Sequence, residues 1–297
     1  TSMSSPVQEE RWNSWGYAEN DNGDLVLGGA KPYVRSSELK RQGILATLEF
    51  RPNDRFTSVV DFYYTDFEDE QLLRGIEIPA FYGPHDVIPV TVSNGFVTEG
   101  IVSQTKTLVR NDYNLRDANV LSLGWNNKVG LSDLWTAEAD VSFSRAKRSD
   151  IALETYAGTG RGNALGARDD IRYQMNGDGT AFFSPQLNYG DYDLIQLGAA
   201  RDWGNPDAVG SADAQDGFLN RPEIEDEMKA IKLSAKRVLE EGMFSSLEFG
   251  VNYSERTKSK LNKGFYLKLN DYPNRVVVPE QFRQGTVGLD FLGMGQM

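Results

Sequence analysis

The sequence predicts an all-β fold, an antiparallel transmembrane β-barrel segment with long extracellular loops. Three pairs of strands carry this prediction, because the strands of each pair are tightly joined while very long polar stretches separate the pairs. The pairs cover about 39–67, 117–146 and 229–256. In each strand apolar and polar side chains alternate over about ten residues, which is the length that a tilted strand needs to cross a bilayer.

The first pair, about 39–67, shows the alternation most clearly. Apolar residues recur at every second position from Ile44 to Phe50, and they recur again from Phe56 to Tyr64 after a turn at 51–54. Because successive side chains of a strand point to opposite faces, these residues share one face. Thr47 lies on the other face.

The second and third pairs repeat the pattern, with turns at 130–133 and 240–242. Charged residues such as Asp140, Lys232 and Glu248 stand in the middle of these strands, opposite the apolar set. A dry core between two sheets would not accept them unpaired, whereas solvent or the wet lumen of a wide barrel would.

Long loops are predicted at 68–116, 147–228 and 257–297, where Gly, Asp, Asn and Pro are frequent. Soluble domains seldom carry such long connections, but outer-membrane barrels do so on their extracellular side. Short apolar runs inside the loops, at 87–92, 96–102 and 193–200, predict hairpins that rise above the membrane. A helix at 223–239 is the rival to the last pair, but the alternation from about 229 favours a strand.

The amino-acid composition argues against several classes of protein function. Of 297 residues 39% are hydrophobic, and no apolar run approaches the ~18 residues of a membrane helix. The net charge of −12 and the scattered basic residues argue against nucleic-acid binding. The chain has no cysteine, and its one histidine, His85, makes a histidine-based metal cluster or a Ser–His–Asp triad improbable. We therefore expect no enzyme activity, no metal site and no cofactor.

Three segments resemble TonB-dependent outer-membrane receptors: 45–56 (LATLEFRPNDRF), 61–70 (DFYYTDFEDE) and 246–256 (SLEFGVNYSER). They look like the branch that is well represented in Xanthomonas- and Caulobacter-type bacteria. The resemblance implies a 22-stranded barrel with an N-terminal plug, driven by the inner-membrane proton gradient through TonB. It also implies energy-dependent uptake of a nutrient across the cell outer membrane, with saccharides favoured and iron chelates as the other possibility.

Against that family pattern the chain shows six clear spanning strands, no plug domain and no TonB box. It also ends at Met297 without the terminal aromatic strand, and its start lacks a signal peptide. We therefore expect residues 1–297 to be an interior fragment of the barrel. The expected partners are outer-membrane lipid, an extracellular nutrient, and TonB through the missing plug.

Six loop residues are the candidates for substrate binding. Aromatic rings can stack on the C–H faces of sugars, and charged side chains can bond their hydroxyls. The alternative is that these side chains pack the loops against one another. The candidates are Tyr82, Tyr156, Arg161, Asp169, Asp170 and Trp203.

Two other classes of protein remain as alternatives. A soluble secreted β-rich glycan-binding module would bury the apolar faces that carry Phe62, Val141 and Phe249 against one another. A carbohydrate-active enzyme is disfavoured, because no convincing acid–base pair of carboxylates stands out.

Overall fold

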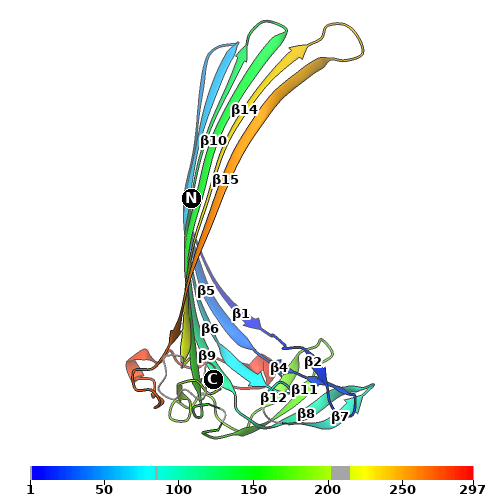
Figure 1. Cartoon of the computed structure of the whole chain (residues 1–297), viewed down its shortest axis with the longest axis vertical. Coiled ribbons are helices and arrows are strands. Elements are labelled where there is room, and N and C mark those ends of the chain that lie inside the picture. Colours follow the sequence, from blue (N-terminus) through cyan, green and yellow to red (C-terminus); the bar gives the residue numbers. More distant parts are fainter. Residues whose placement is uncertain (1, 84–85, 163, 202–214, 297) are drawn as a thin grey trace.

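The computed structural model describes residues 2–83, 86–162, 164–201 and 215–296, and within them the chain is all-β. A large antiparallel sheet of very long strands rises from a base, where a smaller sheet and the loops gather (Figure 1). Among the described residues no helix is long and apolar enough to cross a membrane. The helices found there are two short 3₁₀ turns, η1 (Glu280–Phe282) and η2 (Asp290–Leu292).

The large sheet has the strand order β1-β5-β6-β9-β10-β14-β15, so β1 and β15 form its two edges. Two short strands, β4 (Gly29–Ala30) and β13 (Gln196–Leu197), pair with β6 and β10 beside this main path. The seven long strands are β1 (Ser2–Arg11), β5 (Tyr33–Asn53), β6 (Phe56–Pro79), β9 (Leu108–Gly130), β10 (Trp135–Gly158), β14 (Gly217–Val238) and β15 (Ser246–Leu267).

The smaller sheet has the order β12-β11-β8-β3-β2, with β7 paired to β8. Its turn between β7 and β8 uses Asn94 and Gly95, whose φ angles of 52° and 73° are those of a tight hairpin turn. The predicted runs 87–92 and 96–102 therefore form one hairpin. The third predicted run, 193–200, forms no hairpin of its own and contributes only the two-residue strand β13, which pairs with β10. The position of these segments above a membrane stays a prediction. The strands are β2 (Tyr17–Glu19), β3 (Leu25–Leu27), β7 (Val87–Ser93), β8 (Phe96–Thr105), β11 (Asp169–Met175) and β12 (Ala181–Ser184).

The six predicted strands are present, but they run well past the predicted bounds. They are 21 to 24 residues long, so much of the predicted loops 68–116 and 147–228 is strand. Backbone pairing continues where most side chains on both faces are polar, for example between 68–71 and 114–117. The segment 223–239 lies almost wholly in β14, which excludes the helix. The strand β1 was not predicted.

The buried core lies at the base, where the smaller sheet packs against the lower ends of the long strands. It includes Ile76 and Ile78 of β6, Tyr173 of β11 and Phe183 of β12. The C-terminal segment also enters it through side chains such as Leu289. By contrast, side chains on both faces of β5 and β15 are exposed over the upper part of the sheet.

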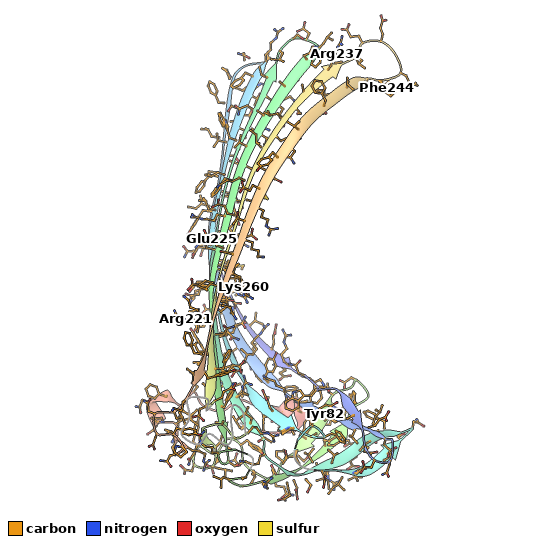
Figure 2. The ribbon with its side chains drawn as sticks, in the orientation of Figure 1. Tyr82, Arg221, Glu225, Arg237, Phe244 and Lys260 are labelled. Atoms are coloured by element: carbon orange, nitrogen blue, oxygen red, sulfur yellow. The ribbon has the colours of Figure 1, made fainter. Side chains whose placement is uncertain are left out.

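The long sheet is curved, and its two faces carry different side chains. Figure 2 shows Lys260 on the inner side of the curve and Glu225 on the outer side. Because side chains alternate along a strand, Ile231 shares the outer, convex face with Glu225. The apolar face of the sheet is therefore its convex face, and the polar face is concave.

Candidate functional site: the concave face and its charge cluster

The pairing register aligns apolar residues into rows across the convex face. One row crosses six strands without a polar side chain, and all of its members are exposed: Leu48, Val60, Trp125, Val141, Ile231 and Tyr253. A contiguous exposed apolar surface of this extent is uncommon on monomeric soluble proteins.

The concave face opposite this row carries hydrogen-bonded polar pairs between neighbouring strands. The Thr47 hydroxyl donates to Asp61 Oδ1 at 2.6 Å, joining β5 and β6. The Asn126 amide of β9 donates to Glu138 Oε1 at 2.9 Å and to Asp140 Oδ2 at 3.2 Å, both on β10. These groups leave acceptor oxygens open on a wet, curved surface.

Further down the concave face, ion pairs replace these hydrogen bonds between a carboxylate and an uncharged donor. Arg148 Nε lies 2.8 Å from Asp150 Oδ1, and Arg116 Nε approaches the same oxygen at 3.4 Å. Arg256 of β15 donates through Nε to Asp226 Oδ1 of β14 at 2.8 Å. Opposite charges therefore compensate one another along and between strands, which holds the polar face together without a covering layer.

At the base, the concave face ends in a buried group that we call the Arg110 cluster: Lys31, Glu77, Arg110, Asp112, Glu154 and Tyr156. Arg110 donates through Nε and Nη2 to the two oxygens of Asp112, at 3.1 and 2.8 Å. Its Nη1 lies 2.5 Å from Glu77 Oε1, and its Nη2 lies 2.7 Å from Glu154 Oε2.

The remaining two members bind to the edges of this cluster. Lys31 Nζ lies 2.8 Å from Glu77 Oε1. The Tyr156 hydroxyl donates to Glu154 Oε2 at 3.0 Å, and the Tyr156 ring lies 5.0 Å from the Arg110 guanidinium carbon. The cluster thus ties β6, β9 and β10 to the segment before β5.

Burial sets the electrostatics of the cluster. The side chains of Arg110, Glu77 and Asp112 are 6%, 7% and 10% exposed, whereas Glu154 is 40% exposed. Burial raises the pKa of the Asp112 carboxyl, and the adjacent Arg110 charge opposes part of that rise. Two cations face three carboxylates, so the cluster carries an excess negative charge when all are ionised.

The geometry indicates what the cluster can do. The Arg110 nitrogens already donate to carboxylates of the protein, so Arg110 has a structural role and does not offer a free site for an anion. Glu154 is the member that reaches solvent, and its oxygens can accept hydrogen bonds from ligand hydroxyls. Within the described residues, no group of three or more His, Asp or Glu side chains is placed to hold a metal ion.

The structure does not gather the predicted binding residues into one site. Tyr156 belongs to the Arg110 cluster, where its ring is buried. Arg161 pairs with Asp216 and donates through Nε to the Pro273 carbonyl oxygen at 2.6 Å, which fastens the C-terminal segment. Tyr82 is 55% exposed, and its hydroxyl donates to the Tyr17 carbonyl oxygen at 3.2 Å.

The other predicted residues lie elsewhere. Asp169 is buried and accepts from the Tyr189 hydroxyl at 3.0 Å. Asp170 accepts from the Gln104 backbone N–H at 2.6 Å, and this hydrogen bond is the main reason that its pKa is lowered. Trp203 falls outside the described residues, as does His85. A binding role for these residues stays a prediction.

The Arg110 cluster itself was missed, apart from Tyr156. Its sequence signal is Arg110 and Asp112 two positions apart, which places both on one face of a strand. Glu77 and Glu154 join them only through the pairing register, which links segments 33 or more residues apart. That register could not be read from one strand alone.

Comparisons with protein-family models, with curated proteins and with solved structures found no match to this chain.

Proposed function

We propose that this chain is part of the wall of a TonB-dependent outer-membrane receptor, which takes up a nutrient by an energy-dependent process. The convex face would contact lipid, and the concave face would line the polar path of the nutrient. The observation that carries the proposal is the unbroken row of six exposed apolar side chains between Leu48 and Tyr253.

The dimensions of the apolar face support a membrane contact. On β9 the convex positions from Leu121 to Val129 are apolar except for Asn127, and they extend about 27 Å along the strand at about 3.4 Å per residue. A tilted strand of this length covers most of an apolar band about 25 Å tall. Below Leu121 the convex face turns polar, with Asn119 and Asp117 at the next two positions of the same face.

The substrate part of the proposal rests on the family resemblance, which favours an oligosaccharide over an iron chelate. The concave face suits a polyhydroxylated ligand, because Asp140, Glu138 and Asn126 offer acceptors and donors at half-exposed positions. In such receptors, TonB acts through the plug domain, which would stand against this concave face.

The soluble glycan-binding alternative fits the structure less well. It requires the apolar faces of Phe62, Val141 and Phe249 to be buried against one another. Val141 is 43% exposed and Phe249 is 55% exposed, while Phe62 is half-buried. Such a face left open to water is costly for a soluble module.

A pair of adjacent arginine substitutions tests the membrane part of the proposal. Val141→Arg places a charge in the middle of the convex face, and we expect it to cost about 2–4 kcal/mol at the bilayer midplane and to impair assembly. Ser142→Arg, the matched control, places the same charge on the concave face and should assemble normally. The measurement is the amount of folded, heat-modifiable protein in purified outer membranes, and equal damage by both substitutions would contradict the proposal.

A further inference from the structure

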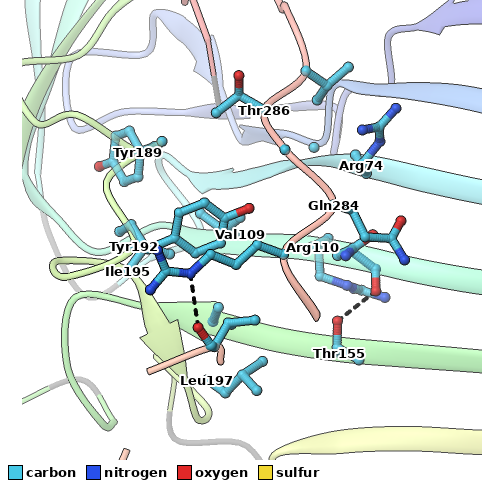
Figure 3. A pocket seen from close by; sticks show the side chains of 18 of the residues that line it. Arg74, Val109, Arg110, Thr155, Tyr189, Tyr192, Ile195, Leu197, Gln284 and Thr286 are labelled. Carbon is cyan, nitrogen blue, oxygen red and sulfur yellow. Dashed lines mark hydrogen bonds between the residues drawn. The ribbon is translucent and has the colours of Figure 1, made fainter. Parts of the chain in front are cut away.

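A cavity of about 440 Å³ lies at the base of the sheet, on the side of β6, β9 and β10 opposite the Arg110 cluster's carboxylates. Two loop segments, 189–195 and 278–287, cover it, and Figure 3 shows the side chains that line it. Its sheet wall includes Leu72, Tyr113 and Leu153, which continue the convex face below the apolar rows. The volume is in the range of small-molecule sites.

Most of the wall is apolar. Aliphatic side chains come from the sheet and from both covering segments: Leu72, Val109, Leu153, Ile195, Leu197 and Val287. The Tyr113 and Tyr192 rings add flat surfaces. A ligand rich in hydroxyls would leave many of them without hydrogen-bond partners against such a wall, so an apolar or aromatic ligand body fits better.

Four charged side chains also line the cavity: Arg110, the exposed Asp191, Arg283 and Arg74. Arg74 differs from the other two arginines. Its side chain is half-buried, and its Nε atom is buried without a hydrogen-bond partner. Across the described part of the chain, no carboxylate forms an ion pair with Arg74. By contrast, Arg110 forms ion pairs with three carboxylates. The guanidinium carbon of Arg283 lies 4.5 Å from the centre of the Tyr192 ring, and Arg283 donates to the Val278 carbonyl oxygen at 3.0 Å.

An anion that binds beside an unpaired, partly desolvated guanidinium would offset the free-energy cost of burying that charge without a partner. The planar fork of an arginine matches a carboxylate through two parallel hydrogen bonds. We propose that this cavity binds a small carboxylate with an apolar, ring-containing body. The carboxylate pairs with Arg74, and the ring packs against Val109, Leu153 and Ile195.

Polar groups beside the apolar wall can complete the recognition. Thr155 donates to the Asn111 carbonyl oxygen at 2.6 Å, so its hydroxyl oxygen keeps lone pairs that can accept from a ligand substituent (Figure 3). The covering residues Arg283 and Gln284 are exposed at the edge of the cavity. Arg74 lies ten positions beyond Tyr64, where the convex apolar face ends on β6, which favours a dissolved molecule over a lipid.

The test is binding of 6-fluoro-2-naphthoate to the purified protein in a non-ionic detergent, followed by ¹⁹F NMR. The neutral primary amide of the same ring system is the control ligand. We expect saturable binding of the carboxylate, and binding of the amide at least about tenfold weaker, because the amide cannot form the charged fork. Detergent partitioning would affect both probes and would not saturate with protein.

Variants locate the binding. Arg74→Gln should weaken carboxylate binding at least about tenfold, and Arg74→Lys should weaken it less, because the charge stays while the fork is lost. Arg221→Gln, which changes an exposed arginine on β14, should leave it unchanged. Equal binding by wild type and Arg74→Gln, or of carboxylate and amide, would overturn the proposal, as would the absence of saturable binding. None of these outcomes bears on whether the sheet spans a membrane, so the uptake proposal is tested separately.

Discussion

Replacing Arg110 by methionine tests whether the charge cluster holds the base of the sheet together. The change keeps an apolar stem and removes the cation that three carboxylates share. Removing one partner of a buried ion pair costs about 3–5 kcal/mol, because the remaining charge stays buried and unpaired. Here Glu77 keeps Lys31 at 2.8 Å, and the exposed Glu154 can turn to water.

The loss therefore falls mainly on Asp112, whose side chain is 10% exposed. We expect a loss of about 3 kcal/mol in the free energy of unfolding at pH 7, at the lower end of that range. In the variant, the pKa of Asp112 should rise further, because burial remains and the opposing cation is gone. A raised carboxyl pKa means that the folded state binds the proton more tightly, so the destabilisation should shrink as the pH falls through that pKa.

The assay is guanidinium chloride unfolding of the protein in lipid vesicles, followed by tryptophan fluorescence at neutral and mildly acidic pH. Arg221→Met is the matched control, because its arginine is exposed, and it should change stability by less than about 0.5 kcal/mol. The double change Arg110→Met with Asp112→Asn should recover part of the loss. If Arg110→Met is no less stable than Arg221→Met, the cluster does not hold the strands and the reasoning is wrong.

Two further predictions concern single positions. In Gly75→Ala, the new Cβ would collide with the Pro32 carbonyl oxygen, so we expect a loss of about 1–3 kcal/mol, whereas Gly124→Ala should be neutral because its nearest contact is 3.7 Å away; urea unfolding compares the two. The lowered pKa of Asp170 means that its hydrogen bond to Gln104 holds at neutral pH and is lost as the pH falls below the usual range of an aspartate. The protection of the Gln104 amide against hydrogen exchange, measured relative to the intrinsic exchange rate at each pH, should therefore fall in acid, and Asp170→Asn should remove that dependence; an unchanged pH profile in the variant would contradict this prediction.

The upper half of the sheet could be predicted from the sequence, because alternation there has a strong apolar signal. From Ile44 to Phe50 one face is wholly apolar and the other carries Thr47 and Glu49 beside Leu45, so both the strand and its apolar face follow from the side-chain period of two. The lower halves carry no such signal. Consecutive polar residues such as Glu68, Asp69 and Glu70 occupy both faces of β6 there, yet their backbone pairs with β5 and β9.

The candidate site was harder to predict, because it depends on register and on loop packing. Arg110 meets Glu77 and Glu154 only when three strands align, and the cavity around Arg74 needs the C-terminal segment to fold back over the sheet. Aromatic residues in loops were a weak guide: Tyr156 packs into the charge cluster. Interactions between distant segments, not local propensity, decide these positions.

The central proposal is that the convex face contacts lipid and the concave face contacts water. The chain has no cysteine, so Val141→Cys and Ser142→Cys each give a single site for a nitroxide spin label. The measurement is the accessibility of each label to oxygen and to a water-soluble nickel chelate, with the protein in lipid vesicles. We expect the label at 141 to collide mainly with oxygen and the label at 142 mainly with the chelate; equal or reversed accessibilities would contradict the central claim.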